Sequence, residues 1–215
     1  MPTPCDDPGR ILSDPADMAE GAAWLATVEP RFAQALALTG TPPLRRREDG
    51  FAALLGAIVS QQVSVAAASA ILGRMESAGL TEPGAILRAD DAEMRAAGLS
   101  RQKIRYARAL AMADLDYDAL RRAPDDQVVA ELTAVPGIGR WTAEIYAMFS
   151  LGRADVFAPA DLALQEAARQ LFELDDRPRE AQLRRMAEPW SPWRTVAAGT
   201  LWAYYKVCKQ REGIL

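Results

Sequence analysis

Hydrophobic positions recur at helical spacing along most of this chain. Apolar side chains three or four residues apart predict a helix, because they then lie on one helical face. Met18, Ala22 and Leu25 form such a series after Asp14, a residue type that can cap a helix start. A second helix is predicted over residues 31–38.

The central part of the chain continues the same pattern. Residues 49–61 carry apolar side chains on one face and predict a helix that packs into a core. Ser64 and Ser100 each precede a further helical series, and the series after Ser64 extends over residues 65–78. Serine is a preferred first residue because its hydroxyl accepts a hydrogen bond from the free amides of the helix start.

Strand patterns are nearly absent from the sequence. A short apolar segment at residues 156–158 is the one candidate. Residues 40–47 hold two prolines and three arginines and predict a linker. The fold class is therefore predicted as all-α, with a central helical domain over residues 48–149 and a second, discontinuous domain from residues 1–47 and 150–215.

A glycine-rich stretch interrupts two helical series near the middle of the chain. It predicts a helix, a tight hairpin and a second helix over residues 125–149. Glycines allow the sharp turn, and the amides of Gly137, Gly139 and Arg140 would stay unpaired at the start of the second helix. Such amides favour an anion such as phosphate. A simple connector between packed helices is the alternative.

Composition restricts the possible chemistry. The 215 residues include no histidine, which excludes a histidine base, a histidine metal site and a Ser-His-Asp triad. Cys5 and Cys208, at opposite ends, offer neither a disulfide framework nor an iron-sulfur cluster. Neither an apolar run of ~20 residues nor a signal-peptide pattern is present, so we expect a cytoplasmic, chromosome-associated protein without membrane contact.

Charge is unevenly distributed on this acidic chain. The net charge of -4 and pI near 5.1 argue by themselves against a nucleic-acid partner. However, residues 177–211 hold eight basic and two acidic residues, whereas residues 1–50 hold five basic and eight acidic ones. The sequence thus permits a basic face, with ordinary solvated helix surfaces as the alternative.

Four segments, in order, resemble the helix-hairpin-helix (HhH-GPD) DNA glycosylases, in particular the DNA-3-methyladenine glycosylase II type. They are IVSQQVSVAAASAI from Ile58, AGLSRQKIRYARALA from Ala97, VPGIGRWTAE followed by DVFAPAD, and PWSPWRTVAAGTLW from Pro189. The resemblance extends over roughly residues 51–205. The resemblance implies two helical domains with an active-site cleft at the hairpin, and removal of alkylated purines from DNA.

The resemblance implies that Asp161 is the catalytic carboxylate. A carboxylate beside the sugar can stabilise the oxocarbenium character of the transition state and orient or deprotonate water. Asp161 also precedes a helical series, so a purely structural cap is the alternative. Asp155 is the weaker candidate, because the family pattern places the catalytic residue after a proline. Trp141 stands where strand-cleaving relatives carry a lysine, which implies hydrolysis without lyase activity.

Further roles follow from the same resemblance. Trp141 and Trp202 would line the pocket of the extruded base, although a core position is the alternative for Trp202. Gln61 and Gln62 would enter the minor groove, with capping of nearby backbone as the alternative. Ile145 stands where a well-known relative has a pocket tyrosine, which leaves the range of accepted bases open.

The resemblance also implies a monovalent cation, Na+ or K+, on the backbone carbonyls of Thr133, Val135 and Ile138, and no other cofactor. Gly137, Gly139 and Arg140 would then contact the DNA backbone, with a surface ion pair as the alternative for Arg140. The expected partner is damaged double-stranded DNA, bound by a monomer. Two alternatives stay open at this point: a DNA-binding module without enzymatic activity, and a glycosylase for mismatched, deaminated or oxidised bases.

Overall fold

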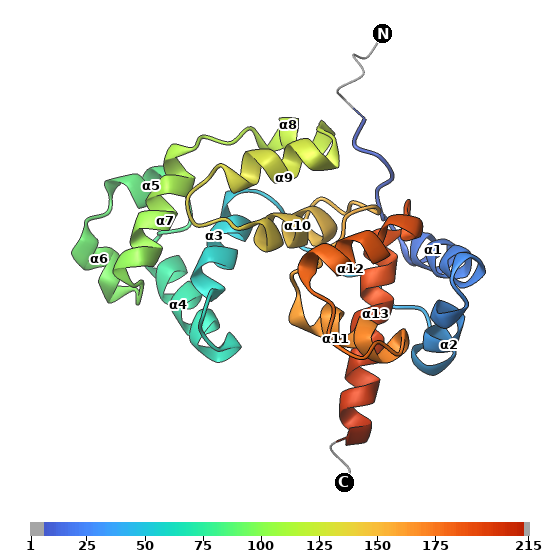
Figure 1. Ribbon diagram of the computed structural model, residues 1–215. Coiled ribbons are helices and arrows are strands. Elements are labelled where there is room, and N and C mark those ends of the chain that lie inside the picture. Colours follow the sequence, from blue (N-terminus) through green and yellow to red (C-terminus); the bar gives the residue numbers. More distant parts are fainter. Residues whose placement is uncertain (1–6, 213–215) are drawn as a thin grey trace. The chain divides into compact units, whose positions relative to one another are not determined.

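The computed structural model describes residues 7–212, with side chains up to residue 210. This part of the chain is helical and contains no strand, only an isolated antiparallel bridge between Ile11 and Arg153 (Figure 1). The all-α prediction is confirmed, and residues 156–158 form no strand. Along the chain the helices are α1 (Pro15–Val28), α2 (Pro30–Thr39), α3 (Phe51–Ser60), α4 (Val65–Ser77), α5 (Pro83–Arg88), α6 (Asp91–Ala96), α7 (Arg101–Met112), α8 (Tyr117–Arg122), α9 (Asp125–Thr133), α10 (Arg140–Phe149), α11 (Leu162–Leu171), α12 (Glu180–Met186), the 3-10 helix η1 (Glu188–Trp190) and α13 (Arg194–Glu212).

The described chain divides into two compact units. The central unit comprises residues 47–146, and the terminal unit comprises residues 7–46 together with 147–212. The sequence placed the second boundary three residues later, after residue 149. The last turn of α10 groups with the terminal unit. Met148 in this turn is buried, and it lines a small cavity together with Leu12 and Trp202 of that unit.

The central unit forms around α7. This helix packs against α3, α5 and α6, and α3 also packs against α4. Its amphipathic sequence explains this position, since one face supplies apolar side chains to the core and the other carries charged residues. The core of this unit includes Leu54, Ile58, Met75, Ile86 and Leu110, all almost fully buried.

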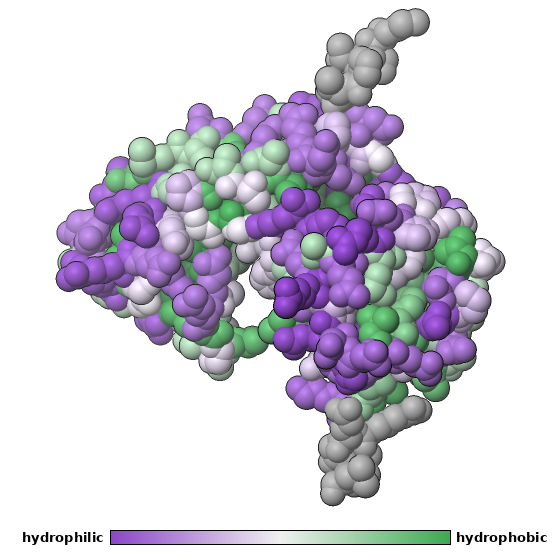
Figure 2. Space-filling model, viewed as in Figure 1, coloured by the Kyte–Doolittle hydropathy of each residue, from purple (hydrophilic) through white to green (hydrophobic). Residues whose placement is uncertain are grey.

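The terminal unit packs α13 against α1, α2 and α11. An aromatic cluster lies between these helices. Phe32 and Phe157 meet the ring of Trp190 edge-on, while Phe172 stacks on it with centroids 5.7 Å apart. Gly21 of α1 lies against Trp193, where a Cβ atom would be 2.6 Å from the indole, so a larger residue would disrupt the packing. Figure 2 shows polar residues over most of the visible surface of each unit.

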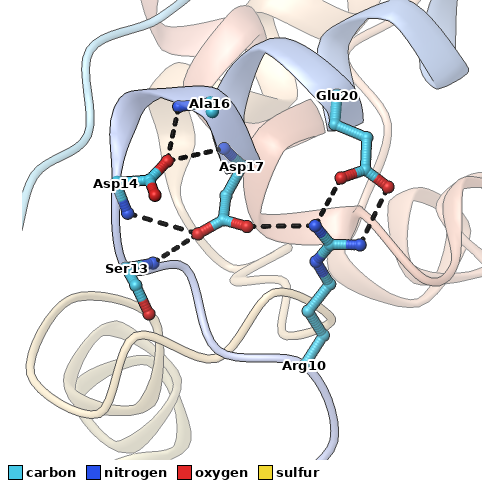
Figure 3. Close-up of polar contacts among 6 residues, drawn as sticks. All are labelled: Arg10, Ser13, Asp14, Ala16, Asp17 and Glu20. Atoms are coloured by element: carbon cyan, nitrogen blue, oxygen red, sulfur yellow. Dashed lines mark hydrogen bonds and ion pairs between the residues drawn. The ribbon is translucent and has the colours of Figure 1, made fainter.

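Capping side chains fix the start of α1 (Figure 3). Asp14 accepts hydrogen bonds from the first turn, and Asp17 bonds back to the Asp14 amide, which completes a capping box. The Arg10 guanidinium donates hydrogen bonds to the carboxylates of both Asp17 and Glu20. Hydrogen bonds from the Ser13 amide first, and from Arg10, lower the pKa of Asp17. The predicted Asp14 cap is confirmed, and the capping box adds a second carboxylate.

The segment before α1 is fastened to residues 150–154. The Leu12 amide donates to the Gly152 carbonyl at 2.7 Å, and the Ala154 amide donates to the Arg10 carbonyl at 3.0 Å. Arg46 bridges the two segments through the carbonyls of Leu12 and Ser150. This double attachment fixes the start of the loop that leads to α11.

Two further findings concern sequence features outside these cores. No helix in residues 7–212 is both long and apolar enough to cross a bilayer. Cys208 is a free, half-buried thiol, and Cys5 lies outside the described residues.

Candidate functional site

Asp161 begins α11 in the terminal unit. Its Oδ1 atom accepts hydrogen bonds from the amides of Ala163 at 2.9 Å and Leu164 at 3.1 Å. The predicted N-cap is therefore confirmed. The same oxygen accepts a third hydrogen bond, at 3.2 Å, from the indole Nε1 of Trp202. Because Asp161 is only partly buried, its carboxylate combines a fixed orientation with access to solvent.

The loop before Asp161 is anchored on both sides. The Thr195 hydroxyl of α13 lies 2.6 and 2.8 Å from the carbonyl oxygens of Arg153 and Val156, so its single hydrogen can be donated to either or shared between them. The buried Gln165 side chain reaches back from α11 and donates to the Pro159 carbonyl at 2.8 Å. Sequence reasoning missed both anchors, because a glutamine or threonine inside a helical series gives no sign of a distant backbone partner.

Asp155 has a different environment. Arg194 donates to its two carboxylate oxygens through Nε and Nη2, each at 2.7 Å, and the Ser191 hydroxyl donates at 2.7 Å. This paired fork joins the loop to the start of α13. Asp155 therefore forms a structural ion pair with Arg194. Asp161, in contrast, accepts a hydrogen bond from the indole of Trp202.

Trp202 contacts a second aromatic side chain that sequence reasoning did not select. The ring centroids of Trp202 and Phe149 lie 5.7 Å apart with an interplanar angle of 32°. Both rings border a cavity of about 40 Å³, together with Pro42, Leu44 and other residues. This cavity is too small for a purine. Trp202 is half-buried, so it contributes to the core and also reaches the surroundings of Asp161.

The hairpin turn, residues 134–139, lies in the central unit between α9 and α10. Gly137 has φ of +100°, and a Cβ atom there would lie 2.4 Å from Cγ of Tyr106. Only glycine meets both conditions. Gly139, by contrast, has open space around its α-carbon. Among the described residues, the amides of Gly137, Gly139 and Arg140 donate no backbone hydrogen bond.

Two buried side chains hold the hairpin turn in the core. Val135 and Ile138 are 4% and 3% exposed, and the Ile138 amide donates to the Val135 carbonyl at 3.0 Å. Thr133, at the end of α9, is exposed. In the described residues no group of histidine, cysteine, aspartate or glutamate side chains could hold a metal ion.

The turn after α3 is attached to the hairpin turn. Gln61 donates from Nε2 to the Gly137 carbonyl at 2.9 Å, a partner 76 residues away that neither predicted role had named. Lys103 donates from Nζ to the Val59 carbonyl at 2.6 Å. Gln62 is exposed and has φ of +57°, a conformation that is rare for residues other than glycine. A groove of about 240 Å³ borders this turn, lined by Gln61, Gln62, Val63, Ser100, Gln102, Lys103 and Tyr106.

Arg140 and Trp141 occupy the first turn of α10. Arg140 donates from Nε to the buried Glu144 at 3.0 Å, the surface ion pair expected as the alternative to a DNA contact, while its side chain stays 59% exposed. Trp141 is 43% exposed, and Ile145 one turn later is half-buried. Trp141 belongs to the central unit, whereas Trp202 and Asp161 belong to the terminal unit.

Comparisons with known proteins identify the family of this chain. A family model described as HhH-GPD superfamily base excision DNA repair protein matches residues 55–192. DNA-3-methyladenine glycosylase 1 of Schizosaccharomyces pombe is 32% identical over 170 residues, which cover 75% of each chain. An alkylbase DNA glycosidase-like protein of the same yeast is 24% identical over 94% of this chain and 100% of its own length.

Solved structures give the same result. The crystal structure of a DNA-3-methyladenine glycosidase from Bacillus halodurans has a TM-score of 0.82 and 33% identity, covering 94% of this chain and 95% of that chain. The Schizosaccharomyces pombe 3-methyladenine DNA glycosylase, solved in complex with abasic DNA, has a TM-score of 0.73 and 29% identity over 88% of this chain and 97% of that chain.

Proposed function

Because the chain belongs to the HhH-GPD superfamily of base excision DNA repair proteins, we propose that it is a DNA glycosylase that removes alkylated purines of the 3-methyladenine type. The names of relatives at 32% and 33% identity support this substrate class. The partner is damaged double-stranded DNA, supported by a similar enzyme solved with abasic DNA. We propose that the protein acts as a monomer.

The observation that carries the proposal is the set of three hydrogen bonds to Oδ1 of Asp161. Two come from the start of α11, where the helix dipole stabilises negative charge. The third, from Trp202, couples the carboxylate to an aromatic wall. A carboxylate held in this way stabilises the positive charge that develops on the sugar as the glycosidic bond breaks, and it orients the attacking water.

Alkylated purines suit an aromatic site without a histidine. Their positive charge favours an indole face by about 1–2 kcal/mol through cation-π attraction. It also makes the base a good leaving group, so the reaction needs no general acid. We assign Trp202 and Trp141 to the walls of the base pocket, and Ile145 to the position that sets the range of accepted bases.

We further propose that the enzyme has no lyase activity. A lyase needs a nucleophilic amine beside the sugar. Lys103 donates to the Val59 carbonyl, and Lys206 and Lys209 follow Trp202 on α13 by four and seven residues, a rise of ~6 and ~10 Å away from the level of the Trp202–Asp161 contact. Trp141 occupies the position that the resemblance gives to a lysine. The expected product is therefore an intact strand with an abasic site.

The hairpin turn would bind the DNA backbone. Amides of Gly137, Gly139 and Arg140 would face a phosphate, with Gln62 inserted at the gap left by the extruded base. The carbonyls of Thr133, Val135 and Ile138 would hold Na+ or K+, an assignment supported by the burial of the Val135 and Ile138 side chains, which fixes the turn. When bound, the cation would offset the charge of that phosphate.

The test is release of free bases from methylated duplex DNA by wild type and Asp161→Asn, with nicks scored before and after alkali. We expect methylated purines from wild type alone and nicks only after alkali. Asparagine keeps the cap but not the charge, so equal release by the variant would refute the role of Asp161. Binding without release would favour the non-enzymatic module, and release of uracil or 8-oxoguanine instead would favour the other glycosylase class.

A further inference from the structure

The C-terminal half of α13 is basic. Residues 202–212 hold Lys206, Lys209 and Arg211 against Glu212 alone, and these two lysines are two of the three in the chain. Both lysines are exposed, and Figure 1 shows the last turns of α13 extending past α11. Among the described residues, Lys206 makes no ion pair. This contrasts with Arg10, which is clamped by two carboxylates.

The two lysines lie on the face of α13 that carries Trp202. Lys206 and Lys209 follow Trp202 by four and seven residues, and each residue turns the helix by about 100°, so the three side chains fall within about 60° of one another. The helix rises by ~6 Å from Trp202 to Lys206 and by ~10 Å to Lys209. Trp202 donates to Asp161 on this face, so the lysines form a strip that leads away from the carboxylate.

Helix electrostatics alone do not explain this arrangement. Cations near a helix C-terminus are stabilised by the dipole, but that effect is the same all around the helix. Two lysines three residues apart also repel each other. Lys209 is held over the ring of Tyr205, with 5.9 Å from Nζ to the centroid, which orders one member of the strip on the Trp202 face. Two exposed lysines on one helix face, of which Lys206 makes no ion pair among the described residues, fit an external anion.

We propose that Lys206 and Lys209 form a phosphate-binding strip for the DNA strand that carries the extruded nucleotide. This inference rests on the proposed function, because it takes Asp161 as the position of the sugar. The two ammonium groups are point charges on flexible stems, suited to phosphates without base readout. The strip contacts two phosphates beside the damaged nucleotide, in the terminal unit and independently of the hairpin turn.

Salt dependence of DNA binding provides the first test. The probe is a short duplex with a tetrahydrofuran abasic-site analogue, and binding is followed by fluorescence anisotropy at several salt concentrations. Each phosphate contact adds about 0.9 to the slope of log K against log salt, so Lys206→Gln with Lys209→Gln should lower the slope by about 2. Replacement of both lysines by arginine should keep the slope.

The matched control is Arg88→Gln with Arg95→Gln. These arginines are exposed near the ends of α5 and α6, and their replacement changes the net charge by the same amount. An equal loss of slope in both double variants would indicate a general charge effect and would overturn the strip. Thermal melting of each variant verifies that the fold is unchanged.

Replacing single DNA phosphates by uncharged methylphosphonates tests which phosphates the two lysines contact. Methylphosphonates next to the abasic analogue should weaken wild-type binding but have little further effect on the lysine variant, since the shared contact is already lost. Additive effects would overturn the proposal. Wild-type base release with an unchanged salt slope in the variant would reject the strip alone, whereas a wild-type protein that neither binds nor cleaves damaged DNA would reject the proposed function with it.

Discussion

The hairpin turn of the central unit presents backbone atoms, whereas the loop before α11 in the terminal unit presents a side chain. Gly137 is fixed by its positive φ and by Tyr106, so the chain itself is shaped there. Asp161 is instead fixed by hydrogen bonds that arrive from α11 and α13. A backbone site is therefore sensitive to any added atom, while a side-chain site is sensitive to the loss of charge or of a single donor.

The largest expected effect separates capping from chemistry at Asp161. Asp161→Asn should lower base release by about 10²–10³-fold, the usual loss when one electrostatic group is removed from an active site. Asp161→Ala should lose activity similarly and also cost about 1 kcal/mol of stability, because alanine cannot cap α11. Single-turnover base release and denaturant unfolding measure the two quantities. Equal stability of the two variants would show that the cap contributes little.

A smaller effect is expected at the hairpin turn. Gly137→Ala should destabilise the protein by about 1–2 kcal/mol for the left-handed backbone alone, and further through the collision with Tyr106. Gly139→Ala is the control for stability, because an added Cβ atom there would meet no other residue within 4 Å apart from its chain neighbours. Adding Tyr106→Ala to Gly137→Ala should relieve the collision but not the backbone strain. Denaturant midpoints that rank the two glycine variants in the opposite order would contradict this explanation.

The neighbouring glutamines should separate stability from binding. Gln61→Ala removes the bond to the Gly137 carbonyl and should cost about 1 kcal/mol of stability. Gln62→Gly removes a strained backbone and should stabilise by about 1 kcal/mol, while binding to abasic DNA weakens. Unfolding and anisotropy titrations test both. If only the Gln61 variant binds abasic DNA more weakly, then Gln61, and not Gln62, is the residue that contacts DNA.

The smallest expected effect is a loss of stability at alkaline pH, and it arises from two tyrosines of the central unit. Burial raises the pKa of Tyr117 and of Tyr146 to about 12, above the ordinary tyrosine value. The unfolded chain then loses these protons first, so their contribution to stability is complete below about pH 10 and is lost as the pH rises towards 12. Melting temperatures across this range should fall, and less so in Tyr117→Phe. An identical pH profile would assign the alkaline loss to other groups.

Much of the fold could be read from local sequence. Asp14, Ser64, Ser100 and Asp161 cap the helices that they were predicted to cap, because a cap depends on residues within three positions along the chain. The helix, hairpin and helix of residues 125–149 likewise follow from local apolar spacing and glycine positions. The boundary after residue 149 came three residues late, since burial of Met148 depends on partners from elsewhere.

The sequence by itself determined the helices, their caps, the absence of histidine chemistry and, by resemblance, the residues to inspect. Only the tertiary structure decided their partners: Trp202 with Asp161, Gln61 with Gly137, and Arg194 with Asp155. Helical periodicity shows which face of a helix is buried, but not which distant side chain meets it. Those pairs form across 41, 76 and 39 positions of the chain, where only packing of the whole unit sets the distance.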